Sequence, residues 1–377
     1  MWRSVQGPVT KLDGRETSTA LARCMLAGSR YPANQRKGCA VQQEKDSATW
    51  GPVVEFPEFP TEGCYPCETE FDLMGNIWTA QVNGNKMAKI NPKTLEITEV
   101  PLPNKSAAPG GMERGPDGNI WYAQVHGNAI GRIDTTTLEI TNFEFPWAAL
   151  YDVGPEGRGS HTFGTAIPFD MTFGHDGNLW FIMAGINAIG QLNMTDFTYT
   201  KWDLETPRTG LFCMQRGPGD TVAFSMWNSN EIGLMDVFTK EIRIWKVPTP
   251  DSLVGGLTRS PDGKYLWFSE GGGQKLGRLD PDTGEIEEYP LNGGADLDPG
   301  CLRFGSDGKL YFVTGMYRNG DKVGRFDTVT KEDSYLTTPT PNSAPCDLSA
   351  EEPGRIYFGE FTGNRLAYFD IPLTPEG

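Results

Sequence analysis

Two short sequence patterns recur seven times along the chain at nearly constant spacing. The first combines a tight turn with an apolar strand: MGNIW (74–78), DGNIW (117–121), DGNLW (176–180), GDTVAF (219–224), DGKYLWF (262–268), DGKLYF (307–312) and PGRIYF (353–358). The second follows each of these: MAKIN (87–91), IGRID (130–134), IGQLN (189–193), IGLMD (232–236), LGRLD (276–280), VGRFD (323–327) and LAYFD (366–370). From Trp78 to Trp121 is 43 residues, and from Trp267 to Tyr311 is 44. A period of this size, with several short strands per unit, is typical of β-propeller blades.

The sequence therefore predicts an all-β fold, a seven-bladed β-propeller with four-stranded blades. The last repeat ends near Leu373 without an outer strand, whereas the segment 52–59 has the pattern of one. We expect this N-terminal strand to complete the last blade, because a closed ring leaves no open sheet edge. The glycine of the second pattern is expected to let neighbouring blades approach closely. We assign 51–377 to the propeller and 1–50 to an N-terminal extension, partly helical or disordered, with a short helix over 17–29.

Composition and charge restrict the partners of the chain. It has 33 basic and 49 acidic residues and a formal net charge of −16, which disfavours nucleic acid and anionic membranes. No segment resembles a membrane span or an export signal, so a cytoplasmic protein is expected. The seven cysteines are an odd number in a long chain, which favours reduced thiols over a disulfide framework. Glycosylation triplets begin at Asn104 and Asn193 and are interpreted as coincidental.

Three segments, GPDGNIWYAQ (115–124), GNAIGRID (127–134) and ITEVPLP (97–103), together resemble the virginiamycin B lyase family of seven-bladed propellers. The resemblance covers roughly residues 52–373. It implies a site in the central funnel, where a histidine acts as acid or base to open an ester-linked ring by elimination. It also implies acidic residues and Mg²⁺ near that histidine.

The family's histidine follows the proline that opens an inner strand and precedes a glutamate by fourteen residues. In the last blade of this chain Glu360 occupies the glutamate position, but Cys346 stands in place of the histidine. Ala344 occupies the matching metal-ligand position, and Gly300 stands where the preceding blade would offer a second histidine. The resemblance therefore implies the fold without most of the elimination machinery. The chain also resembles fungal propellers that act as hetero-Diels–Alderases in tropolone-sesquiterpene pathways.

The funnel is expected where the loops that enter the inner strands meet the loops that join the second and third strands. An apolar, aromatic surface with few polar groups suits a hydrophobic organic ligand. The candidate substrate-binding residues are Cys67, Phe169, Met183, Phe212, Met226, Trp227, Glu270, Tyr317, Cys346 and His161. Glu68, Asp170 and Asp347 are also expected near the axis, where burial and repulsion raise carboxyl pKa values. The alternative for each carboxylate is a hydrogen bond to backbone amides where the strands begin.

The candidate catalytic residues are Glu360, Gln81, Gln124 and His126. His126 either contacts ligand or is a turn residue, because asparagine occupies its position in other blades. His161 lies in the insertion 147–167, which is either a lid over the funnel or a solvated loop.

The cysteines are interpreted as structural. Cys64 and Cys67 form a Cys-x-x-Cys motif, but its position where a strand begins argues against a low thiol pKa. Burial as small apolar side chains is expected for Cys67, Cys213, Cys301 and Cys346. A single motif of this kind is also weak support for a thiolate metal site.

Three functions are compatible with these patterns. The first is a cofactor-independent cyclase that performs a hetero-Diels–Alder or related pericyclic ring closure on a small hydrophobic metabolite, because positioning and one or two hydrogen bonds to a carbonyl suffice. The second is an elimination or lactone-opening lyase with His126 or Glu360 as base and Mg²⁺ held by carboxylates. The third is a non-catalytic binding propeller.

Overall fold

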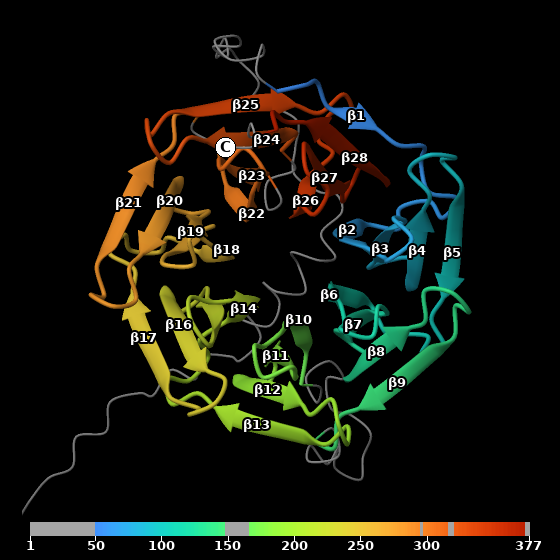
Figure 1. The fold of residues 1–377 in the computed structure, drawn as a ribbon, viewed down its shortest axis with the longest axis horizontal. Coiled ribbons are helices and arrows are strands. Elements are labelled where there is room, and N and C mark those ends of the chain that lie inside the picture. Colours follow the sequence, from blue (N-terminus) through green and yellow to red (C-terminus); the bar gives the residue numbers. More distant parts are fainter. Residues whose placement is uncertain (1–49, 148–165, 295–296, 316–319, 374–377) are drawn as a thin grey trace, which may run out of the picture. The chain divides into compact units, whose positions relative to one another are not determined.

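The computed structural model of the chain describes residues 50–147, 166–294, 297–315 and 320–373. Within these residues, 28 strands form seven four-stranded antiparallel sheets arranged around a ring (Figure 1). The seven-bladed propeller predicted from the sequence is confirmed. Blades 1 to 6 each take four consecutive strands, and blade 7 combines the last three strands with β1.

The strands occupy four concentric positions. The inner strands are β2 (Pro66–Phe71), β6 (Pro109–Arg114), β10 (Pro168–Phe173), β14 (Leu211–Arg216), β18 (Val254–Arg259), β22 (Pro299–Phe304) and β26 (Pro345–Ser349). The second strands are β3 (Ile77–Gln81), β7 (Ile120–Gln124), β11 (Leu179–Met183), β15 (Thr221–Met226), β19 (Leu266–Glu270), β23 (Leu310–Thr314) and β27 (Arg355–Glu360). The third strands are β4 (Lys86–Ile90), β8 (Ala129–Ile133), β12 (Ala188–Leu192), β16 (Glu231–Asp236), β20 (Lys275–Leu279), β24 (Lys322–Phe326) and β28 (Arg365–Asp370). The outer strands are β5 (Ile97–Pro101), β9 (Ile140–Glu144), β13 (Tyr199–Asp203), β17 (Ile242–Lys246), β21 (Ile286–Pro290), β25 (Asp333–Thr337) and β1 (Val54–Glu55).

The turn between the inner and second strands explains why Asp-Gly and Trp recur together. The carboxylate of Asp117 accepts hydrogen bonds from the Trp121 indole N–H at 3.1 Å and from the Asn119 backbone N–H at 3.2 Å. Gly118 between them has φ +76°, which glycine adopts without a steric penalty. Trp121 is fully buried, and a buried indole N–H needs an acceptor. One aspartate therefore shapes the turn and satisfies the core tryptophan.

The glycine of the third strand accommodates an aromatic ring from its own blade. Gly277 pairs with Phe268 across β19 and β20, and a Cβ at Gly277 would lie 2.0 Å from the Phe268 ring. Gly190 faces Phe181 in the same way at 2.1 Å. The expectation that this glycine serves contact between neighbouring blades is therefore wrong, because the close contact is a cross-strand pair within one sheet.

The ring closes as the sequence predicts. Val54 and Glu55 of β1 pair with Tyr368 and Ala367 of β28. The backbone N–H groups of Phe56 and Phe59 donate to carbonyls of Leu366 and Asn364 at 2.9 Å each, which extends the contact. The N-terminal segment thereby covers the edge of the last blade.

Some predictions lie outside the described residues. These are the helix expected over 17–29, most of the insertion 147–167, and the positions of His161 and Tyr317. In the described part of the chain, no helix is long and apolar enough to cross a membrane.

Candidate functional site

Every inner strand contains a β-bulge near its beginning. In blade 3, Pro168 pairs with Met183 and Met171 with Phe181, so that β10 carries one residue more than β11. The same irregularity occurs in the other six blades. A bulge re-aims side chains, and neighbouring inner strands contact one another around the whole ring. The bulged pairs that meet around the axis are Cys67-Glu68, Gly110-Gly111, Phe169-Asp170, Phe212-Cys213, Gly255-Gly256, Gly300-Cys301 and Cys346-Asp347.

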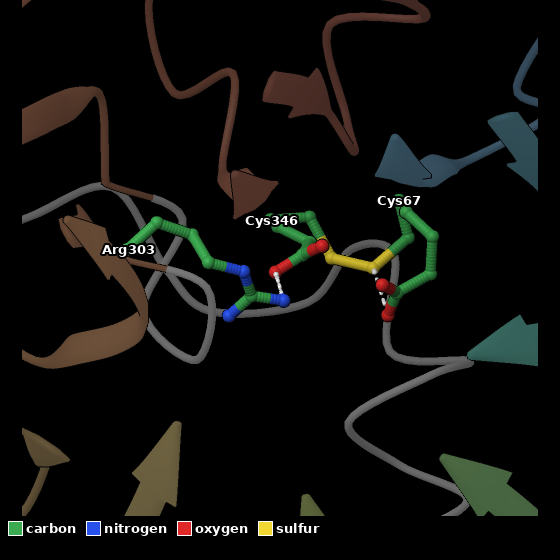
Figure 2. Close-up of a disulfide and its surroundings, with 5 residues drawn as sticks. Cys67, Arg303 and Cys346 are labelled. Carbon is green, nitrogen blue, oxygen red and sulfur yellow. Dashed lines mark hydrogen bonds and ion pairs between the residues drawn. A yellow bond between two sulfur atoms is a disulfide. The ribbon is translucent and has the colours of Figure 1, made fainter. Parts of the chain in front are cut away.

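Cys67 and Cys346 form a disulfide between the inner strands of blades 1 and 7. Figure 2 shows the bond spanning the two strands, with the Arg303 side chain pointing toward Cys346. The prediction that these two cysteines are reduced is wrong. Sequence reasoning missed the pair because its members are 279 residues apart and only ring closure brings their Cα atoms to 5.1 Å.

The carboxylates that follow the two cysteines lie beside an arginine. Asp347, which is buried, forms an ion pair with Arg303, with Oδ1 at 3.4 Å from the guanidinium nitrogen Nη2. Glu68 Oε1 lies 4.0 Å from Cys67 Sγ (Figure 2). Burial, the Asp347 charge and a hydrogen bond with Asp347 raise the pKa of Glu68 well above its usual range. The surroundings therefore favour the protonated form of Glu68, next to the Asp347–Arg303 ion pair.

Asp170 continues this polar cluster on blade 3. Its two carboxylate oxygens each accept a backbone N–H at 2.8 Å, one from Met171 and one from Met214. Burial raises its pKa to about 6, although these bonds favour the ionised form. A Cβ at Gly111 would lie 2.6 Å from Asp170 Oδ1, so glycine there lets blade 2 approach.

Aromatic side chains border the polar cluster. Phe169 and Phe212 have ring centroids 5.2 Å apart, and Trp227 meets Phe212 edge-on at 4.7 Å. Phe169 and Trp227 are half-buried, so their rings retain exposed surface. The structure thus brings together three of the predicted substrate-binding residues, each on or next to the inner strands that carry Asp170 and Cys213.

The predicted residues at the ends of the second strands lie elsewhere. Gln81, Gln124, Met183, Met226, Glu270 and Glu360 are all at most 1% exposed. Each is the last residue of its strand and pairs with the first residue of the inner strand. The expected exposure at a funnel mouth is not observed for these side chains, because that end of the strand is covered by protein. Their catalytic and binding roles stay predictions.

Gln81 shows what this buried position does. Its Nε2 donates to Glu99 Oε1 on the outer strand at 3.0 Å, and Lys86 pairs with the same carboxylate at 2.7 Å. Burial opposes ionisation of Glu99, but the bonds from Lys86, Gln81 and Thr61 outweigh it and lower the Glu99 pKa to about 2. Gln124 likewise donates to Asn142 of the outer strand at 2.6 Å. The side-chain amides of Gln81 and Gln124 thus link the second strand to the outer strand of their blades by hydrogen bonds.

Glu270 and Glu360 occupy the same position with a carboxyl group instead. Neither oxygen of either group has a hydrogen-bond partner among the described residues. Burial, followed by the charge of Glu288, raises the Glu270 pKa to about 8. Burial, followed by the charge of Glu55, raises the Glu360 pKa to about 8. Both carboxyl groups therefore favour the protonated form near neutral pH.

His126 is exposed on the turn after β7, and its backbone N–H donates to the Ala107 carbonyl at 3.1 Å. Partial burial of its ring lowers its pKa. The backbone hydrogen bond to Ala107 holds the turn in place, and the exposed imidazole ring is accessible to solvent. Its role stays a prediction.

The remaining described cysteines are free. Cys64 and Cys213 are buried, as expected for Cys213, whereas Cys301 is half-buried. Burial raises the pKa of Cys64 to about 12 and raises those of Cys213 and Cys301 as well. The Cys-x-x-Cys motif thus forms no redox pair, because Cys67 bonds to Cys346 instead.

The positions that would match the family's Mg²⁺ ligands do not fit the ion. Ala344 and Gly300 carry no ligand atoms on their side chains. Glu360 is fully buried with a raised pKa. Among the described residues, no group of three or more histidine, cysteine or acidic side chains is arranged to hold a metal.

Sequence analysis missed three residues of the site. Arg303 lies two positions beyond the bulge of β22, where the other blades have Glu, Thr, Gln or Ser. This departure from the repeat was the available signal. Tyr65 and Phe361 stack with centroids 4.7 Å apart next to the disulfide-linked strands. They flank different strands far apart in the chain, so no local pattern joins them.

Comparisons with known proteins agree with this architecture. The virginiamycin B lyase family model matches residues 45–157 and 160–372. Virginiamycin B lyase from Nocardia farcinica (strain IFM 10152) is 27% identical over 205 residues, which span 54% of this chain and 66% of that protein.

Solved structures show the same fold. Virginiamycin B lyase from Staphylococcus aureus, with selenomethionine, superimposes with a TM-score of 0.73 at 23% identity over 85% of this chain and 99% of its own. A catalytically inactive histidine-to-alanine variant of that enzyme with quinupristin gives the same values. A streptogramin B lyase gives 0.74 at 21% identity over 87% and 100%. The family model covers most of the chain, and the chain therefore belongs to the virginiamycin B lyase family.

Proposed function

We propose that the chain is an enzyme that closes a ring in a small hydrophobic metabolite at the polar cluster on the propeller axis. The reaction is a hetero-Diels–Alder or related pericyclic addition, in which a conjugated carbonyl compound and an alkene join without loss of any atom. The proposal assigns no cofactor to the reaction.

One observation carries this proposal: Glu68, whose carboxyl pKa burial raises well above its usual range, lies beside the Asp347–Arg303 ion pair. A carboxylic acid that keeps its proton at neutral pH donates a strong hydrogen bond. Donated to a carbonyl oxygen, such a bond stabilises the negative charge that develops there in an asynchronous cycloaddition. Without ligand, the single O–H of Glu68 has Asp347 as its acceptor. A bound carbonyl oxygen would replace Asp347 as that acceptor, while Asp347 stays paired with Arg303.

The aromatic side chains supply the second requirement, which is positioning. Phe169 and Phe212 precede Asp170 and Cys213 on the inner strands β10 and β14, and Trp227, which follows β15, contacts Phe212. Flat apolar surfaces hold two hydrocarbon reactants in contact, and the resulting gain in effective concentration lowers the barrier. A polar donor beside an apolar surface suits a metabolite with one carbonyl and a hydrocarbon body.

An elimination lyase is the second candidate, favoured by family membership. The residue that matches the family's histidine is Cys346, and its sulfur is bonded to Cys67, so it carries no proton to transfer. The elimination would need another base, and the candidates for it are His126, which is exposed, and Glu360, which is buried. The third candidate is a binding propeller that catalyses no reaction, and the experiment must distinguish it from both enzymes.

The test offers the purified chain two reactions. In one, an ortho-quinone methide released in solution meets a cyclic alkene, and rate and enantiomeric excess are measured by chiral chromatography. In the other, quinupristin is followed by liquid chromatography and mass spectrometry for ring opening. We expect a faster addition with one dominant enantiomer. Ring opening instead would establish the lyase, and a racemic addition at the background rate would reject the cyclase.

Variants of Glu68 then test the role of its proton. The wild-type rate should fall as pH rises, because the donor proton is lost as Glu68 ionises. Glu68→Met should lower the rate about 100-fold, the usual cost of one preorganised donor. Glu68→Gln keeps a weaker N–H donor and should give a reduced rate without the alkaline decline. Glu70, two residues further along β2, is a half-buried acid whose pKa is also raised well above its usual range, so Glu70→Gln is the matched control. An equal loss there would contradict a specific role of Glu68.

A further inference from the structure

Three features bear on where this chain matures. The disulfide joins Cys67 and Cys346, and the triplets Asn104-Lys105-Ser106 and Asn193-Met194-Thr195 are acceptor sites for N-linked glycans. We propose that the chain matures in an oxidising secretory compartment and carries N-linked oligosaccharides on Asn104 and Asn193. This goes beyond the proposed function and does not depend on it.

The disulfide is the first argument. Disulfides form and persist in secretory and extracellular environments, whereas thiol reductants keep cytosolic cysteines reduced. Cys67 is 7% exposed and Cys346 fully buried, so the bond is an internal part of the fold rather than a surface crosslink. Among the described cysteines, Cys64, Cys213 and Cys301 stay free, so the pairing is selective. The expectation of a cytoplasmic protein rested on the lack of a segment resembling a membrane span or an export signal, and the disulfide argues against it.

The position of the triplets is the second argument. Both lie in turns between strands: Lys105 and Ser106 are exposed in the first, and Thr195 is exposed in the second. The two turns connect β5 with β6 and β12 with β13. Asn104 and Asn193 are themselves half-buried and lie outside the strands, so a glycan attached there leaves every strand pair in place.

The hydrogen bonds of the two asparagines are the third argument. Asn104 Oδ1 accepts the Ser106 backbone N–H at 3.1 Å, and Asn193 Oδ1 accepts that of Thr195 at 2.8 Å. Each asparagine shapes its turn through the oxygen, while a glycan is attached at the nitrogen Nδ2. The modification therefore preserves the bond that forms the turn.

Other asparagines of the repeat use the nitrogen. Asn230 Nδ2 donates to the Val247 carbonyl at 3.1 Å and to the Thr249 carbonyl at 2.7 Å. Asn85 Nδ2 donates to the Asn104 carbonyl at 2.8 Å. Neither of these is followed two residues later by Ser or Thr. The glycosylation triplets thus coincide with asparagines whose nitrogen the turn does not require.

The test uses the full chain isolated from the organism that makes it, with thiols alkylated at lysis. Peptide mapping without reductant should recover Cys67 linked to Cys346. Peptide N-glycosidase in heavy-oxygen water should lower the intact mass and label Asn104 and Asn193 as they convert to aspartate. Unlabelled asparagines would overturn the glycan sites, and alkylated Cys67 and Cys346 would overturn the secretory compartment.

Paired variants separate the triplet from the local fold. Ser106→Ala and Thr195→Ala should each remove one glycan, whereas Ser106→Thr and Thr195→Ser keep the triplet and should keep the glycan. If the alanine variants retain the full mass shift, the sugar is attached elsewhere and the assignment fails.

Discussion

At the scale of single residues, the last position of the second strand carries an amide in some blades and a carboxyl group in others. Blades 1 and 2 have Gln81 and Gln124 there, and blades 5 and 7 have Glu270 and Glu360. The glutamines bond to outer-strand side chains, whereas the glutamates leave both oxygens without hydrogen-bond partners among the described residues. An unpaired buried carboxyl costs stability whenever it is ionised.

Glu360→Gln should therefore stabilise the chain at alkaline pH. The folded-state pKa of Glu360 is raised from 4.5 to about 8, so folding binds a proton, and the stability this provides is lost as pH rises between these values. The variant should gain about 1–3 kcal/mol in unfolding free energy at pH above 8 and little near pH 4. Urea unfolding at both pH values measures this.

Glu270→Gln should behave alike, and the exposed Glu285→Gln is the control that should change nothing. A variant whose stability keeps the wild-type pH dependence would show that Glu360 is not the group responsible. The turnover of the same Glu360→Gln samples tests a catalytic role. A variant that is more stable but has lost turnover would show that Glu360 takes part in the reaction.

At the scale of elements, blades 2 to 6 each fit an aromatic ring of the second strand over a glycine of the third. The pairs Phe181–Gly190, Phe224–Gly233 and Phe268–Gly277 have the same register and near-identical close contact. Blade 1 solves the same problem differently, with Thr79 opposite Ala88. Blade 7 pairs Phe358 with Ala367, so glycine is usual at this position without being present in every blade.

Gly277→Ala should destabilise the chain by about 1–3 kcal/mol, because the new methyl group overlaps the Phe268 ring. In the Phe268→Thr background, which reproduces the smaller pair of blade 1, the same substitution should cost much less. Unfolding free energies of the four proteins in this double-mutant cycle measure the coupling. Equal costs in both backgrounds would contradict a direct clash.

At the scale of the whole molecule, two devices close the ring between blades 7 and 1. Strand β1 closes it at the periphery by pairing with β28, and the Cys67–Cys346 bond closes it at the axis. The disulfide also fixes the two strands from which Glu68 and Asp347 project. Stability and the geometry of the polar cluster thus depend on the same junction.

Replacing both cysteines with serine should lower the unfolding free energy by about 2–5 kcal/mol, because the unfolded chain regains the freedom that the crosslink removes. Reductant should bring the wild type to the stability of the double variant and leave the variant unchanged. Denaturant unfolding with and without dithiothreitol provides the comparison. An equal shift in both proteins would mean that the reductant acts elsewhere.

The sequence by itself determined the blades. Turn residues, strand periodicity and the Asp–Trp spacing act over ten residues or fewer, and therefore predicted the strands, their number and the closing segment correctly. Phe169, Phe212 and Trp227 were also found in this way, because the repeat places them by position.

Only the tertiary structure decided which of these positions face the axis and which are buried. Bulges in the inner strands, the cysteine pair 279 residues apart and the Arg303–Asp347 contact all arise when seven sheets close into a ring. The physical reason is that such contacts join residues with no local relation in the chain, and their distances are fixed by the curvature of the ring. Burial of Glu270 and Glu360 arises instead at the turns that follow their strands, where Gly273 and Gly363 lie close to the carboxyl groups.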